Sequence, residues 1–136
     1  MTRRVYMVTV VAVIISMFAL ASAAMATHKK GSEGCTPGYW KNHVGTGSGL
    51  LFETVFEDTA VTSATTTLQQ AASLGGGGVN ALVRHAAAAY LSSVNDVDYL
   101  YHPEEVVAMF NAAHPGGDIE GTKNLFEAQN ELGCPL

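Results

Sequence analysis

The side chains best suited to chemistry lie in one short run that places a phenol, an indole, an amine, an amide and an imidazole at consecutive positions, Tyr39, Trp40, Lys41, Asn42 and His43. One interpretation is a small polar binding site in which His43 converges with His85 from a distant segment. The other is structural: Trp40 plugs the core, Tyr39 stacks beside it, and the polar neighbours bond the backbone of a loop that has no secondary structure of its own. We expect the structural role and keep the binding site as the alternative.

A metal centre would be the sharper form of that site, and its pool of ligands is the five histidines, His28, His43, His85, His102 and His114. No pair of them has the helical spacing of metal ligands. His102 and His114 each precede a proline at a predicted helix boundary, where capping and turn geometry account for them. We therefore expect no metal and no other cofactor, with His43 and His85 as weak metal candidates.

The sequence also lacks the common signatures of hydrolases and metalloproteases. It contains neither a Gly-x-Ser-x-Gly elbow nor a His-Glu-x-x-His motif. Glu104 and Glu105 are adjacent on a predicted helix, so their carboxylates point apart and do not suit a catalytic pair. We expect that the protein is not an enzyme.

The two cysteines, Cys35 and Cys134, stand far apart in the sequence and are predicted to form a disulfide. The alternative, a pair of thiolate metal ligands, is weaker because there is no Cys-x-x-Cys motif. Closing a loop of about 100 residues stabilises a fold by about 4.7 kcal/mol in the chain-entropy model. Half of that amount would still matter to a small domain.

The N-terminus has the order of a secretory signal peptide. Arg3 and Arg4 precede an uncharged run, and small residues follow, with candidate cleavage sites after Ala23 and Ala26. We favour Ala26, which makes residues 1–26 the signal peptide and residues 27–136 a single secreted domain. The alternative is an uncleaved membrane anchor, because the uncharged run is long enough to span a bilayer. We expect a secreted protein, extracellular or at the cell surface.

The charge of the mature chain argues against nucleic-acid binding. Loss of Arg3 and Arg4 leaves 5 Lys and Arg against 12 Asp and Glu, a net charge of −7. The remaining basic residues are scattered, so no basic face is available to replace phosphate counterions. A chain of this length supports one modest core and no second domain.

Hydrophobic periodicity predicts a mainly α-helical fold. The glycine-rich residues 31–49 should form a long irregular loop. Val79–Val94 has an apolar stripe and small residues opposite it, so it should be a central helix covered on two sides. Three further helices are expected: one near Leu68 to Leu74, one from His102-Pro103, and one from about Asp118 or Thr122 to Leu132. The result is a small disulfide-clasped domain of about four helices with a long Gly-rich N-terminal loop.

The small-residue face of the central helix predicts where the loop docks. Ala81, His85, Ala88 and Ser92 line up on it, which leaves room for another segment to approach closely. We expect Trp40 to be buried and His85 to lie within contact range of the loop from Gly34 to His43.

Three segments together carry a resemblance: the opening Gly34-Cys35-Thr36-Pro37-Gly38-Tyr39-Trp40-Lys41-Asn42-His43, the Leu74–Gly78 turn before Ala81–Ala86, and the ending Glu131-Leu132-Gly133-Cys134-Pro135-Leu136. They resemble a family of secreted prokaryotic proteins marked by a C-T-P-G-[YF]-W-K-N-H opening and an L-G-C-P close. The resemblance covers essentially the whole mature chain. It implies export, a common fold and extracellular or surface placement, and the family has no established enzymatic activity.

These observations favour an exported structural or interaction module that assembles with itself into a filament or layer. The glycine-rich loop and the hydroxyl-rich stretch from Thr59 to Thr67 offer low-charge backbone with which a neighbouring copy could pair. The expected partner is a second copy or another extracellular protein, with no nucleic acid and no membrane contact beyond the signal segment. The alternative function is a secreted ligand- or metal-binding domain using Trp40, His43 and His85.

Overall fold

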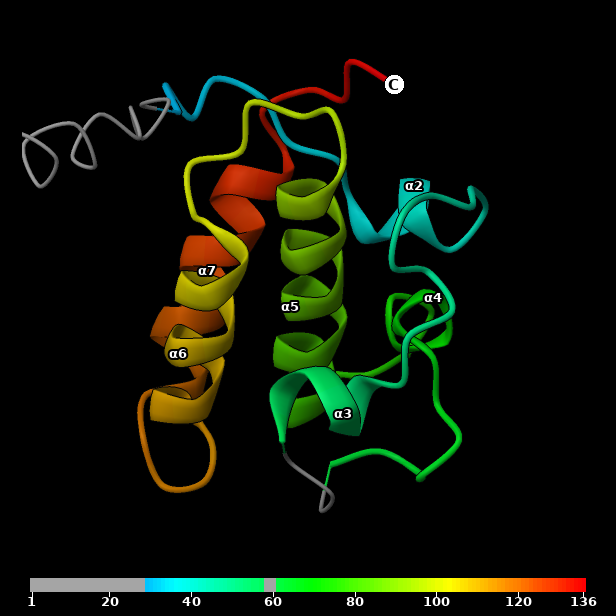
Figure 1. The fold of residues 1–136 in the computed structure, drawn as a ribbon. Coiled ribbons are helices and arrows are strands. Elements are labelled where there is room, and N and C mark those ends of the chain that lie inside the picture. Colours follow the sequence, from blue (N-terminus) through cyan, green and yellow to red (C-terminus); the bar gives the residue numbers. More distant parts are fainter. Residues whose placement is uncertain (1–28, 58–60) are drawn as a thin grey trace, which may run out of the picture.

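The computed structural model describes residues 29–57 and 61–136, and the predicted signal peptide lies outside these residues. Within them the chain forms three short helices, α2 (Pro37–Trp40), α3 (Phe52–Phe56) and α4 (Leu68–Ala71), followed by three long ones, α5 (Val79–Val94), α6 (Pro103–Ala113) and α7 (Ile119–Asn130). The described part has no strands beyond two isolated β-bridges, Gly34 with Gly133 and Leu51 with Thr67. The prediction of a mainly helical domain is confirmed (Figure 1).

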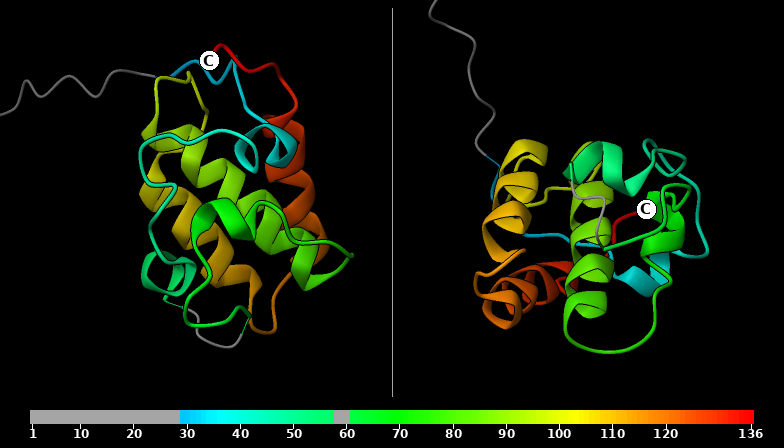
Figure 2. Two further views of the ribbon diagram at one scale, coloured as in Figure 1. Left: turned by 90° about the vertical axis from the view of Figure 1, so that its right-hand side faces the viewer. Right: turned by 90° about the horizontal axis from the view of Figure 1, so that it is seen from below.

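Helix α5 is the central element, as its pattern predicted. α6 and α7 pack on one side of it and α2 and α4 on the other (Figures 1 and 2). Leu82, Val83 and Leu91 are fully buried, and so is the alanine run from Ala86 to Ala89. Small side chains let neighbouring elements approach the α5 backbone closely from both sides, so most faces of the helix contribute to the core.

The two helices after α5 begin at clear capping signals. Pro103 occupies the first turn of α6, and the Glu105 carboxylate accepts a hydrogen bond from the His102 backbone N–H at 2.7 Å. The Asp118 side chain accepts from the Gly121 N–H at 2.8 Å and so caps α7. Helix α7 ends at Asn130, two residues before the predicted end.

Helix α2 corrects the prediction of an irregular loop over residues 31–49 in one place, whereas α4 lies where a short helix was predicted near Leu68 to Leu74. Thr36 caps α2 by accepting from the Tyr39 N–H at 3.1 Å, and Pro37 follows it in the first turn. These two residues are enough for one helical turn inside a glycine-rich stretch. Helix α3 was not predicted either; its Phe52 and Phe56 pack against Phe110 of α6.

The ends of the described chain are clasped together. Cys35 and Cys134, separated by 99 residues, form the predicted disulfide. Beside it the Gly34 N–H donates to the Gly133 carbonyl at 3.0 Å, and the Gln129 amide donates to the Gly31 and Glu33 carbonyls at 3.1 and 3.0 Å. A side chain at Gly34 would collide with the Gln129 backbone, so only glycine allows this approach.

Candidate functional site

Trp40 points into the core and is only 1% exposed. Its indole Nε1–H donates to Ser92 Oγ on α5 at 3.0 Å, and the Cys35 backbone N–H donates to the same oxygen at 3.3 Å. The Tyr39 ring meets the Trp40 ring edge-on at 5.1 Å between centroids. The prediction that Trp40 is buried and flanked by Tyr39 is confirmed.

The neighbouring side chains lie outside the core and secure the loop. The Tyr39 and His43 rings stack at 4.0 Å with an interplanar angle of 3°, and His43 Nδ1–H donates to the Tyr39 carbonyl at 2.8 Å. Asn42 donates to the Gly38 carbonyl at 3.0 Å. Gln69 of α4 donates to the Lys41 and His43 carbonyls at 3.4 Å each. Asn42 and His43 therefore act as the predicted backbone tethers, while the Lys41 side chain is exposed.

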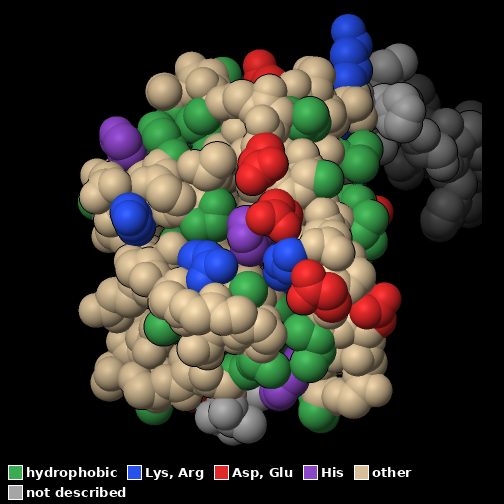
Figure 3. Space-filling model, turned by 180° about the vertical axis from the view of Figure 1, so that it is seen from behind, with side chains coloured by type: hydrophobic (Ala, Val, Ile, Leu, Met, Phe, Trp, Pro, Cys, Tyr) green, Lys and Arg blue, Asp and Glu red, His purple; other side chains and the backbone are tan. Residues whose placement is uncertain are grey.

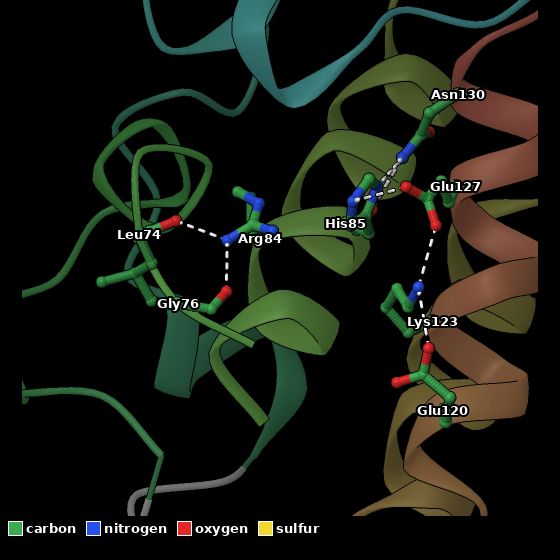
Figure 4. Close-up of polar contacts among 8 residues, drawn as sticks. All are labelled: Leu74, Gly76, Arg84, His85, Glu120, Lys123, Glu127 and Asn130. Atoms are coloured by element: carbon green, nitrogen blue, oxygen red, sulfur yellow. Dashed lines mark hydrogen bonds and ion pairs between the residues drawn. The ribbon is translucent and has the colours of Figure 1, made fainter. Parts of the chain in front are cut away.

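His85 lies on α5, on the face that packs against α7, and is 7% exposed. Asn130 Nδ2 lies 3.5 Å from His85 Nδ1 and donates to the His85 carbonyl at 3.1 Å, while His85 Nε2 lies 3.8 Å from a Glu127 oxygen (Figure 4). Burial lowers the pKa of His85 below its ordinary 6.5; Glu127 opposes this lowering, and the charges of Arg84 and Lys123 add to it. Neutral imidazole is thus the favoured form.

A charged network surrounds His85 at the surface. Lys123 bonds Glu127 at 2.9 Å and Glu120 at 3.0 Å, which raises the pKa of Lys123 and lowers that of Glu127. Arg84 turns away and donates to the Leu74 and Gly76 carbonyls at 2.7 and 3.0 Å (Figure 4). Seen from behind, acidic, basic and histidine side chains gather on this face (Figure 3). Through its two bonds to the Leu74 and Gly76 carbonyls, Arg84 holds the glycine-rich turn before α5.

The structure directs the candidate histidines to different neighbours. His43 contacts Tyr39 and α4, whereas His85 contacts α7, and none of the described contacts joins the two. Ser92, on the small-residue face, forms hydrogen bonds with the loop. Sequence reasoning placed Ser92 on that face but assigned it no role; a hydroxyl in line with small residues was the available signal.

The remaining candidates are dispersed. His102 precedes the first residue of α6, His114 follows α6, and His28 lies outside the described residues. Across residues 29–57 and 61–136, no three His, Cys, Asp or Glu side chains are grouped closely enough to hold a metal ion. In that same part of the chain, no helix is both long and apolar enough to cross a membrane.

Comparison of the chain with family models, curated proteins and solved structures found no match.

Proposed function

We propose that this chain is an exported structural or interaction module that associates with copies of itself, in a filament or layer at the cell surface or in the extracellular matrix. The observation that carries the proposal is that this small disulfide-linked domain exposes large hydrophobic side chains to solvent. Among residues 29–57 and 61–136, seven large hydrophobic side chains are at least 36% exposed: Val44, Leu50, Leu51, Leu100, Leu125, Leu132 and Leu136. Burial against a neighbour stabilises association by roughly 25 cal/mol per Å² of apolar surface.

The grouping of these side chains matters more than their exposure, because single exposed leucines are ordinary on protein surfaces. Val44, Leu50 and Leu51 share the connection between α2 and α3, and Leu132 and Leu136 flank Cys134. Both segments are tied to the body of the domain, one through Trp40 and the other through the disulfide. Preordered apolar segments lose little conformational entropy when they are buried by a partner.

Export is supported by three independent features. The disulfide is compatible with an oxidising, extracellular location. The N-terminal sequence has the order of a signal peptide, and the opening and closing motifs resemble those of secreted prokaryotic proteins.

Sedimentation velocity of oxidised residues 27–136 tests the proposal. We expect species heavier than the monomer, in proportions that rise with protein concentration. The net charge of −7 opposes association, so added salt should strengthen it. Removing divalent ions with a chelator should leave the distribution unchanged. A strict monomer at high concentration, with and without salt or divalent ions, would remove the proposal.

A second candidate function is ligand or metal binding at the same motif, and the stack of the half-buried Tyr39 with the exposed His43 is the observation that favours it. Trp40 is buried, so it would support such a site from behind rather than contact the ligand. The described contacts of His85 are with α7 and not with this stack. The discriminating measurement is metal content after purification from the native source. Stoichiometric metal in a monomeric protein would favour this candidate over self-assembly.

A further inference from the structure

An open cleft of about 500 Å³ is lined by residues of α3, α5 and the first turn of α6 and its neighbours. Its walls are mainly apolar, and a threonine and a carboxylate are also part of the lining: Thr54, Val55, Tyr90, Pro103, Glu104 and Val107. The volume falls within the range of about 300–1,000 Å³ typical of ligand sites, so the cleft can take more than one side chain.

The most exposed of the large hydrophobic side chains belongs to Val44, at 83%. It follows Lys41, Asn42 and His43 in the loop after α2. The next residues are clamped to the end of α5, because the Thr46 N–H donates to Asn95 Oδ1 at 2.9 Å and Asn95 Nδ2 donates to the Thr46 carbonyl at 3.0 Å. We call residues 41–44 the knob. It combines three exposed polar side chains with one exposed valine, on a preordered base.

The knob and the cleft carry complementary charge. The knob contains exposed Lys41, and the cleft is lined by exposed Glu104, with Glu53 on the same short helix as Thr54 and Val55. Among the described residues, no ion pair involves Lys41 or Glu104. In an acidic chain, a contact that brings a lysine to a carboxylate avoids the like-charge repulsion that most other contacts would create.

The knob of one molecule cannot enter the cleft of the same molecule. The loop after α2 lies on the side of α5 opposite α6, as Figures 1 and 2 show. The knob therefore lies across α5 from α6, which forms one wall of the cleft. A projection that fits a cleft elsewhere on an identical copy makes a head-to-tail contact, and such contacts generate rings or open filaments.

We propose that the knob of one copy docks in the cleft of the next, with Val44 between the apolar walls and Lys41 against Glu104. This inference rests on the proposed self-association and names its contact. It also gives the Tyr39–His43 stack a role, because that stack supports the base of the knob.

Two single variants, each expected to fold, block one half of the contact. Val44→Asp puts a charge on the knob and leaves the cleft intact. Thr54→Arg crowds the cleft and repels Lys41 while leaving the knob intact, at a position that is exposed in the monomer. The matched control is Asn124→Asp, which adds the same negative charge at an exposed position on α7, outside both features and outside the exposed hydrophobic set. Circular dichroism checks that all three variants fold.

We expect each blocking variant alone to sediment as a monomer and Asn124→Asp to assemble like the unmodified chain. An equimolar mixture of Val44→Asp and Thr54→Arg should form a one-to-one dimer that does not grow, because only one knob and one cleft remain functional. Lys41→Glu and Glu104→Lys should each weaken the association affinity by roughly two- to fivefold. The double variant that carries both changes should recover most of that loss.

The outcomes separate this contact from the broader proposal. If the unmodified chain assembles and both blocking variants assemble equally well, the contact is wrong and self-association stands. If both variants are monomeric but their mixture gives no dimer, the knob and cleft are not partners. If the unmodified chain never assembles, the proposed function and the contact fail together.

Discussion

Ser92→Ala removes a single oxygen, but that oxygen accepts two buried N–H groups, from Trp40 Nε1 at 3.0 Å and from the Cys35 backbone at 3.3 Å. Trp40 and Cys35 are 1% and 0% exposed, so water cannot replace the lost acceptor. A buried donor left without a partner costs about 1–3 kcal/mol. The longer bond is the weaker one, so we expect the free energy of unfolding to fall by about 2–4 kcal/mol.

A double-mutant cycle separates the two bonds. Trp40→Phe keeps an aromatic ring but removes the indole N–H, so Ser92→Ala should cost about 1–2 kcal/mol less in that background. Trp40→Ala removes the plug itself and should cost about 3–5 kcal/mol.

Urea unfolding of the oxidised chain measures these differences. Far-ultraviolet circular dichroism is the probe, because the Trp40 variants have no tryptophan fluorescence. The slope of stability against urea should not change. Ser73→Ala, at an exposed serine that bonds the Gln69 carbonyl, is the control and should cost less than about 0.5 kcal/mol. The reasoning fails if Ser92→Ala is as mild as that control, or if its cost is the same in both backgrounds.

Three further predictions concern the clasp and the α5–α7 contact. Reduction, or Cys35→Ala with Cys134→Ala, should lower stability by about 2–5 kcal/mol, and an unchanged urea midpoint would contradict this. Gly34→Ala should cost about 1–3 kcal/mol because its side chain meets backbone, whereas Gly49→Ala, with open space around it, should be near neutral; equal melting temperatures would refute the close approach. Because the folded state lowers the pKa of His85, protons bind the unfolded chain more readily. The stability that comes from neutral His85 should therefore be fully present above about pH 6.5 and should be lost as the pH falls below that value. The melting temperature of His85→Gln should depend less on pH between about pH 6.5 and 5 than that of the unmodified chain.

The long helices and the disulfide could be predicted because their signals are local or compositional. Val79–Val94 has an uninterrupted apolar stripe, and Pro103 and Asp118 mark helix starts by their own chemistry. Helix α3 has only five residues, too few for a periodic pattern, and its stability comes from packing against α6. Tertiary contacts of this kind leave no trace in a short window of sequence.

The site was predictable only in part for the same reason. The single tryptophan in a glycine-rich loop predicted a core plug, and Trp40 is one. The hydrogen-bond partner of that plug depends on where along α5 the loop packs, and that partner is Ser92. The neighbours of His85 depend on which helix covers that face, and the covering helix is α7. Helix order and rotation are properties of the assembled core and not of any one segment.

The most direct test of the account is electron microscopy of extracellular material from the native source, combined with an intact-mass measurement of the chain within it. We predict filaments or layers that contain the chain from residue 27 onward, lighter by two hydrogens than its reduced form. A chain that keeps residues 1–26, or one that is found outside the cell only as a dispersed monomer, would contradict the claim of an exported, self-assembling module.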